Sequence, residues 1–287
     1  MSLHRFLDTP LAITERRAAT MLHDLQKRVL FPHNEHGKDW ESVMQALVDE
    51  TAVKAVSVNY IDDDATTYKV ISGVAVIPIS GVLVHGNTSL WDETNYGSIT
   101  TQFDDAMANS EVRGIALQIS SPGGEVSGLF ELAETIYDKK SEKPVWAILD
   151  DHAYSAAYAL ASAADKVTVP RTGGVGSIGV LTMHLDLTKL LETTGIKVSL
   201  IQYGERKTDY SPFRPLSDVA KARLQTDVDT IGEMFVEMIG RNRRLSRAKI
   251  RATEAGIFMG NQGVEQGLAD VIMSPQHAFA ALVAKVN

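Results

Sequence analysis

Three short segments of this chain carry groups that together could cleave an acyl bond. The first holds Ser155, in "DDHAYSAAYALASAADK", where a turn leads into an alanine-rich stretch of helical character. A hydroxyl at a helix N-terminus lies in positive partial potential, which stabilises a developing alkoxide. The alternative is a serine that only caps the helix. The flanking alanines bear on this choice, because they let the helix approach a sheet closely and leave space before the hydroxyl.

The second segment, "ISSPGGEVSG", places Gly123 and Gly124 between a predicted buried strand and a predicted helix. Paired glycines at such a point leave backbone N–H groups able to face an anion. A phosphate-binding loop needs further glycines and a Lys-Ser/Thr pair, which this segment lacks. An oxyanion hole needs only one or two N–H groups and fits better. An ordinary strand-to-helix turn remains the alternative.

The third segment, "QYGERKTDYSPFRPLS", carries Lys207 after a predicted strand and a glycine. A serine nucleophile needs a base, and a buried lysine with a lowered pKa can serve, as in serine–lysine variants of the catalytic triad. The alternative is a solvated loop lysine. Two histidines are rival bases: His152, and His184 with Asp186 nearby, which would make a serine–histidine–aspartate enzyme.

Composition narrows the classes of protein to which the chain can belong. Its 287 residues suffice for one large domain with an appendage, and its 44% hydrophobic and 22% charged residues are ordinary for a globular protein. The formal net charge of -8 argues against nucleic acid or an anionic membrane as the main partner. The absence of cysteine excludes disulfides, thiolate metal sites and cysteine nucleophiles.

Neither a membrane segment nor a metal site is predicted. The longest apolar run, Val74–Val84, is too short to span a bilayer, and the first twenty residues lack the apolar core of a signal peptide. We therefore expect a soluble protein. His33 and His36 have metal-like spacing, but no second cluster of ligands accompanies them, and Asp62–Asp64 is typical of a solvated loop. We expect no metal and no cofactor.

The elements that must position the three segments alternate along the chain from residue 71. Before it, helical periodicity predicts two helices, within 14–30 and 40–56. The alternation of strands and helices predicts an α/β domain with a largely parallel sheet, in which the ends of strands bring loops together. Strands are predicted at 73–81, 112–120, 144–150, 166–170, 177–183, 196–202 and 269–273, and helices at 98–109, 125–140, 156–164, 186–195 and 218–243.

Six segments in order resemble one family, the signal peptide peptidase A (protease IV) branch of the ClpP/crotonase superfamily. They are "SPGGEVSG", "AYSAAYALASAADKV", "GGVGSIGVL", "GIKVSLIQYGERKTDYSPFRPLS", "FVEMIGRNR" and "GNQGVEQGLAD". The resemblance covers about 73–274 and implies a ClpP/crotonase-like layered α/β fold with mostly parallel sheets flanked by helices. It divides the chain into a helical N-terminal extension (1–70) and a peptidase domain (71–287).

The resemblance also implies roles for individual residues. Ser155 matches the nucleophile, Lys207 the general base, Gly123 and Gly124 the oxyanion turn, and Ser177 a serine that orients the lysine. The short spacing between serine and lysine matches the form of the family in which both lie in one domain. The chain has alanine just after the serine, where family members often have glycine, which affects the turn geometry rather than the role.

The helical first part and the missing membrane segment look most like the tailed-phage version of the family, a capsid-assembly or head-maturation protease. That likeness implies a polypeptide substrate, capsid or scaffold proteins in particular, a closed homo-oligomer, and a place in the host cytoplasm or the phage prohead. Three alternatives stay open. They are a signal-peptide-degrading peptidase without its anchor, a crotonase-type thioester enzyme with an acidic residue near the oxyanion turn, and a non-catalytic assembly protein.

Overall fold

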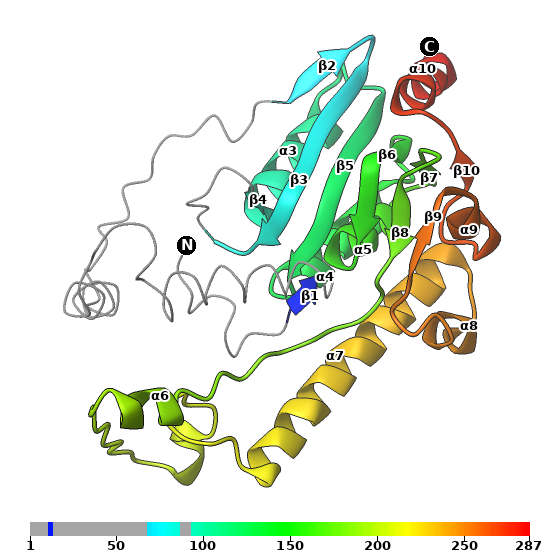
Figure 1. The fold of residues 1–287 in the computed structure, drawn as a ribbon. Coiled ribbons are helices and arrows are strands. Elements are labelled where there is room, and N and C mark those ends of the chain that lie inside the picture. Colours follow the sequence, from blue (N-terminus) through cyan, green and yellow to red (C-terminus); the bar gives the residue numbers. More distant parts are fainter. Residues whose placement is uncertain (1–10, 14–67, 87–92) are drawn as a thin grey trace, which may run out of the picture.

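The computed structural model describes residues 11–13, 68–86 and 93–287, which build a mostly parallel β-sheet flanked by helices (Figure 1). The strand order is β10-β7-β6-β5-β3-β2, parallel from β10 to β3, with β2 antiparallel at the edge. This confirms the predicted α/β class. The strands are β1 (Leu11–Ile13), β2 (Lys69–Ile71), β3 (Val74–Val84), β4 (Glu93–Asn95), β5 (Gly114–Glu125), β6 (Val145–Tyr154), β7 (Lys166–Val169), β8 (Gly174–Gly176), β9 (Ile257–Met259) and β10 (Val271–Ile272).

The helices alternate with the strands, and side-chain caps mark the start of several of them. Asn95 caps the first turn of α3, and Ser217 caps that of α7, each through its side-chain oxygen. The helices are α3 (Tyr96–Ala108), α4 (Leu129–Lys139), α5 (Ala156–Ala163), α6 (Thr188–Thr193), the 3₁₀ turn η4 (Glu205–Thr208), α7 (Asp218–Arg243), α8 (Arg247–Arg251), α9 (Gly260–Glu265) and α10 (Pro275–Val286).

Successive side chains of the central strands face opposite sides of the sheet, as the strand period requires. On β5, Leu117 and Ile119 enter the large core that α3, α4 and α5 cover. Ala116 points to the other face, where it joins Trp146 and Leu282 of α10 in a smaller cluster. Because both faces of the sheet are covered there, β6 begins with the continuous apolar run Val145–Leu149 and β5 with Ile115–Leu117.

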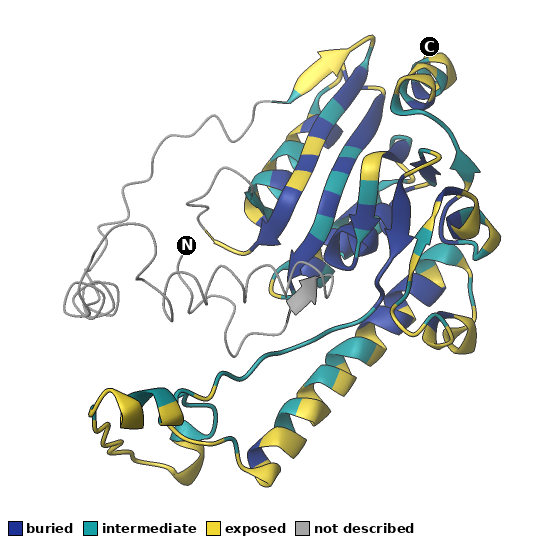
Figure 2. Ribbon diagram, in the orientation of Figure 1, coloured by how far each residue is buried: buried dark blue, intermediate teal, exposed yellow. Residues whose placement is uncertain are grey.

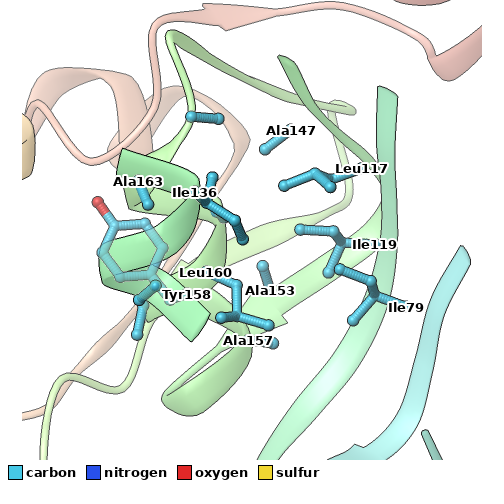
Figure 3. Packing of buried hydrophobic residues seen from close by; sticks show 14 of the residues in the cluster. Ile79, Leu117, Ile119, Ile136, Ala147, Ala153, Ala157, Tyr158, Leu160 and Ala163 are labelled. Carbon is cyan, nitrogen blue, oxygen red and sulfur yellow. The ribbon is translucent and has the colours of Figure 1, made fainter. Parts of the chain in front are cut away.

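The alanine-rich helix α5 lies directly on this sheet. Every one of its residues is buried, and Figure 3 shows Ala157 and Leu160 directed toward Ile119 and its neighbours. Tyr158 points the other way, and its hydroxyl donates to the Leu268 carbonyl at 2.9 Å. The small side chains allow close approach of helix and sheet, as the sequence predicts, and this fixes the position of residue 155 at the helix start.

The long helix α7 joins the sheet to a separate lobe, which we define as residues 181–217. Its 26 residues correspond to about 39 Å of length. The C-terminal half buries Phe235 and Ile239, and α7 packs against α5. The N-terminal half extends away from the sheet, and exposed residues line it (Figure 2). The lobe lies at this outer end (Figure 1).

Most predicted elements are confirmed, and the helix at 218–243 has the predicted limits. The predicted strands at 177–183 and 196–202 are wrong. Strand β8 ends at Gly176, and residues 196–202 have no regular structure and are almost all exposed. Their β-branched residues favour extended backbone, but a strand also needs a neighbouring strand to hydrogen-bond with, and the lobe supplies none in the described residues.

The strand predicted to end at 120 instead continues through Pro122 to Glu125 as β5. The register between β5 and β3 shifts after Ser80, and the register between β5 and β6 shifts after Ile119. Proline is tolerated in strands at such irregular positions. The predicted helices within 14–30 and 40–56, the histidine pair and the aspartate run all lie outside the described residues. The domain boundary at residue 70 stays a prediction, although Leu11–Ile13 is a strand.

Candidate active site

Ser155 occupies a strained turn between β6 and α5. Its φ of 52° and ψ of −119° lie outside the regions that non-glycine residues ordinarily adopt. The backbone N–H of Ser155 donates to the Gly176 carbonyl at 2.8 Å, and its carbonyl accepts from Ala159 at 3.0 Å. Strain of this kind persists only where neighbouring structure enforces it, and it concentrates at functional sites. Catalytic serines of α/β-hydrolases stand on a similar strand-to-helix turn.

The Ser155 side chain does not cap its helix. It makes no capping hydrogen bond to α5, and its hydroxyl donates to the Gly179 carbonyl at a long 3.4 Å. The residue has no exposed surface. The capping alternative therefore loses its support, because a capping serine uses its oxygen to accept a first-turn N–H group.

Ser177 lies beside Ser155 because β8 pairs with β6. The register sets Tyr154 opposite Gly176, so that each strand places a serine immediately after the paired position. Ser177 also has a positive φ of 55°, and its N–H donates to the Gly256 carbonyl at 2.8 Å. Two strained serines thus meet at the end of the sheet, and the structure brings together these two of the residues singled out from the sequence.

The glycine pair stands at the neighbouring strand end. Ser121 of β5 pairs with Ala153 of β6, which places Gly123 and Gly124 alongside the Ser155 turn. Gly123 has a φ of 101°, and a Cβ on Gly124 would lie 1.9 Å from the Leu83 carbonyl oxygen. Both positions therefore need glycine, the first for its backbone angle and the second for the close approach of β3.

The N–H groups at this strand end differ from the prediction in one respect. Gly123 already donates to the hydroxyl of buried Ser121 at 3.2 Å, and that hydroxyl donates to the Gly81 carbonyl at 2.7 Å. The remaining oxyanion candidates are the N–H of Gly124 and that of Ala156 in the first turn of α5. Sequence analysis did not single out Ser121 or Ala156. The place of Ala156, directly after a serine at a helix start, is the signal that could have found it.

Lys207 lies far from this cluster within the single chain. It belongs to η4 in the lobe and is exposed, whereas Ser155 directly precedes α5. The lobe and α5 lie near opposite ends of α7 (Figure 1). The burial expected for a lysine base is therefore absent in one copy. The turn that follows is held firmly, because Asp209 accepts from Arg223 of α7 at 2.6 Å. Most residues of the segment before it are exposed, Ile201 and Tyr203 almost completely.

Neither rival histidine contacts the Ser155 hydroxyl, whose acceptor is Gly179. His152 Nδ1 lies 2.8 Å from Asp151 Oδ2, and its ring stacks on Tyr154. The nitrogens of His184 are buried without a hydrogen-bond partner in the described part of the chain.

The carboxylate beside His184 is engaged elsewhere. Asp186 accepts from the hydroxyl and the N–H of Thr188, at 2.6 and 2.9 Å, and these hydrogen bonds lower the pKa of Asp186. Asp186 thus stabilises the start of α6, and it does not orient the histidine.

An acidic residue does follow the glycine turn, as a crotonase-type enzyme would require. Glu125 is buried, and its carboxylate accepts the backbone N–H of His85 at 2.7 Å. Its carbonyl accepts the hydroxyl of Tyr96 at 2.7 Å, and burial raises the pKa of Tyr96 well above its ordinary value. These contacts hold the loop after β3 against β5. Among the described residues, no three histidine, aspartate or glutamate side chains gather as metal ligands.

Comparison with known proteins identifies the family. The profile of "Peptidase family S49" matches residues 137–287, more than half of the chain and the part that includes Ser155, Ser177 and Lys207. The chain belongs to peptidase family S49. No helix in the described residues is both long and apolar enough to cross a membrane.

Two phage proteins are among the most similar relatives. The chain is 37% identical over 226 residues to the head-tail preconnector protein GP5 of Enterobacteria phage P21, covering 78% of this chain and 45% of that protein. It is 35% identical over 228 residues to the capsid assembly protease C of Escherichia phage lambda, covering 77% of this chain and 52% of that protein. The chain thus spans about half the length of these two curated relatives.

A cellular family member is more distant. The chain is 26% identical over 230 residues to the putative signal peptide peptidase SppA of Enterococcus faecium, covering 77% of this chain and 65% of that protein. The predicted resemblance to the signal peptide peptidase A family is therefore confirmed, and so is its likeness to the phage branch.

Proposed function

We propose that this chain is a serine endopeptidase in which Ser155 is the nucleophile. The observation that carries the proposal is the strained Ser155 turn beside the Gly123–Gly124 strand end. Such a turn holds the hydroxyl at the end of the sheet, where a bound carbonyl can meet both the oxygen and nearby N–H donors. The N–H groups of Gly124 and Ala156 would stabilise the oxyanion, and removal of one such donor typically costs about 3–4 kcal/mol of transition-state stabilisation.

The base in this proposal is Lys207 of a neighbouring copy. Within one chain, Lys207 is exposed at the outer end of α7, while Ser155 is buried at the sheet. A lysine is protonated in water at neutral pH and becomes a base only when burial favours its neutral form. Exposed apolar residues of the same lobe, Leu200, Ile201 and Tyr203, provide a surface for association. Docking of this lobe on a second copy would bury the lysine and complete the dyad.

The reaction is an acyl transfer in two steps. Neutral Lys207 removes the proton of Ser155 Oγ, which attacks the peptide carbonyl and forms a tetrahedral oxyanion. The lysine then returns the proton to the leaving amine as the C–N bond breaks, which leaves an acyl-enzyme. Water, activated by the same lysine, hydrolyses the ester and regenerates the serine. Ser177, whose backbone stands beside Ser155, would hold the lysine nitrogen in line.

The substrates we propose are phage capsid or scaffold proteins. The support is the greater similarity to a capsid assembly protease and a head-tail preconnector protein, at 35% and 37% identity, than to the signal peptide peptidase at 26%. Degradation of signal peptides by the same site is the second candidate function, favoured by that more distant relative. We also propose that the protein works in the host cytoplasm or prohead as a closed homo-oligomer.

The test is covalent labelling with a fluorophosphonate probe, followed by mapping of the labelled residue by mass spectrometry. We expect the label on Ser155 in the native protein and in His184→Ala, and none in Ser155→Ala. Lys207→Arg should label at least about a hundredfold more slowly, because guanidinium stays protonated. Label on another residue, or rapid labelling of Lys207→Arg that is lost in His184→Ala, would replace this mechanism by another.

A further inference from the structure

Besides β3, strand β1 also pairs with the glycine turn of β5. Strand β1 pairs antiparallel with the end of β5, with Leu11 opposite Glu125, Ala12 opposite Gly124 and Ile13 opposite Gly123 (Figure 1). The paired residues of β5 include both glycines of the proposed oxyanion turn. A segment from the N-terminal part of the chain therefore shares main-chain pairing with the candidate active site.

The register decides which edge of β5 this segment uses. At Gly123 and Gly124 one edge is taken by β3, through Val82 and Leu83. A strand has only two hydrogen-bonding edges, so β1 must lie on the other one. That edge belongs to β6 up to the pair of Ser121 with Ala153, after which β6 turns away into Ser155 and α5. Strand β1 fills the gap that this divergence opens.

A gap of this kind is suited to an extended peptide. Main-chain pairing to an exposed strand edge is a general way of binding peptides, because it requires no particular side chains. Within the gap, β1 runs from Glu125 toward Gly123, and its peptide bonds lie along the glycine turn next to the strand that leads into Ser155. Ser155 itself has no exposed surface.

We propose that the Gly123–Glu125 edge is the peptide-binding edge of this protein and that Leu11–Ile13 of the same chain is its resident occupant. The segment competes with substrate for the edge and keeps the single chain in a closed state. This inference rests on the proposed peptidase function for its biological meaning. A tethered segment acts at an effective concentration in the millimolar range, so a free peptide of similar affinity competes poorly.

The experiment measures binding without catalysis. A fluorescent peptide with the sequence of residues 8–16, DTPLAITER, is titrated by anisotropy into three full-length proteins that all carry Ser155→Ala. The first has no other change. The second adds Ala12→Pro and Ile13→Pro, which remove two N–H groups on successive residues, one of which must face β5. The third, a matched control, adds Ala12→Ser and Ile13→Val and keeps every N–H group.

We expect the proline variant to bind the peptide about tenfold or more tightly than the other two proteins, because its edge is open. Hydrogen exchange should show faster exchange at Gly123–Glu125 in the proline variant alone, with addition of the peptide restoring protection. Equal affinities in the three proteins, or no binding to any, would overturn the proposal. Because anisotropy measures binding and not turnover, failure of Ser155 as nucleophile would show in the probe-labelling experiment and would leave this result intact.

Discussion

The two regions that hold the proposed dyad are built in opposite ways. Around Ser155 the backbone is fixed by strand pairing on both sides, and the residue has no exposed surface. Around Lys207 the lobe has one short helix and a 3₁₀ turn, and Tyr203 is fully exposed. Packing in the sheet fixes the position of the Ser155 side chain, whereas the lobe exposes the Lys207 side chain to solvent. In the proposed mechanism, folding therefore positions the nucleophile, and association between copies positions the base.

The strongest test of this comparison uses two inactive variants, Ser155→Ala and Lys207→Ala. Each alone should lose about a thousandfold or more of peptidase activity, since triad-type groups act as a unit. When the two are co-expressed, about a quarter of the sites in a mixed oligomer combine an intact serine with an intact lysine from another copy. We expect hydrolysis of a denatured capsid or casein substrate to return to about that level.

The outcome separates assembly between copies from movement within one copy. If the lobe of the same chain closed over Ser155, no copy in the mixture would hold both groups, and the mixture would stay inactive. Pre-formed separate oligomers mixed after purification serve as the control, since they should regain activity only as fast as subunits exchange.

The next effect in size contrasts two glycines. Gly124→Ala should destabilise the fold by about 2–4 kcal/mol, because its new Cβ would meet the Leu83 carbonyl at 1.9 Å and the backbone of β3 must shift. Gly232 lies in α7 with no atom within 4 Å of a Cβ built there, so Gly232→Ala should stabilise by up to about 1 kcal/mol. Thermal unfolding of the two variants measures both. Equal shifts would mean that the sheet end is less tightly packed than its distances indicate.

A smaller effect tests the lobe. Ile201→Ser with Tyr203→Ser should change the unfolding free energy by no more than about 0.5 kcal/mol, since both side chains are exposed. Activity should nevertheless fall about tenfold as association weakens, which light scattering would follow. Ile71→Ser, on exposed edge strand β2, is the control for loss of an apolar surface residue. Full activity with a monomeric mass would refute the role given to the lobe.

The smallest predicted effect concerns the inner end of α7. Arg243 Nη2 lies 2.8 Å from Asp270 Oδ1, and the Val167 N–H also donates to Asp270. Burial acts to raise the pKa of Asp270, but these hydrogen bonds outweigh it and hold the pKa below its ordinary value. The ionised Asp270 carboxylate therefore stabilises the folded protein above about pH 4, and this stabilisation is lost as the pH falls through the lowered pKa of Asp270.

Asp270→Asn should cost about 1 kcal/mol at pH 7, a modest amount because 35% of the aspartate side chain stays exposed to screening water. The difference in unfolding free energy between variant and native protein, measured by urea unfolding, should disappear as the pH is lowered below about 4. Asp227→Asn, at an exposed position on α7, is the control for loss of a surface charge. A gap that persists at pH 3 would show that packing, and not the charge, sets the difference.

Most of the sheet region was predictable from sequence, whereas in the lobe only helix α6 was predicted correctly, and the reason is physical. Buried strands and α5 leave a strong apolar pattern because burial on both faces constrains their residue types. The run at 196–202 is also rich in β-branched and apolar residues, yet it pairs with no strand of the described sheet and has no regular structure. The continuation of β5 through Pro122 was missed because the irregular register that tolerates it is a property of the pairing with β3.

The candidate site likewise has some features that the sequence predicts and others that it does not. Ser155 and the glycine pair were singled out because a hydroxyl at the start of an alanine-rich stretch and a Pro-Gly-Gly turn can be recognised in the sequence alone. Their juxtaposition follows from the parallel order of β5 and β6, which strand alternation predicts. The position of Lys207 relative to them could not be predicted, because it depends on how the lobe is placed beyond α7. The antiparallel strand at Leu11–Ile13 was not predicted either, since three residues are too few to show the alternating pattern of a strand.

The backbone angles of Ser155 have a consequence for how such a chain would evolve under heat. A residue held at φ 52° and ψ −119° raises the free energy of every folded copy by about 1–3 kcal/mol. That is a large share of the net stability of about 5–15 kcal/mol that a typical protein has. Glycine adopts these angles without strain. A mutant library selected for heat resistance alone should therefore accumulate Ser155→Gly, and the most heat-resistant descendants would be the ones that have lost the proposed chemistry.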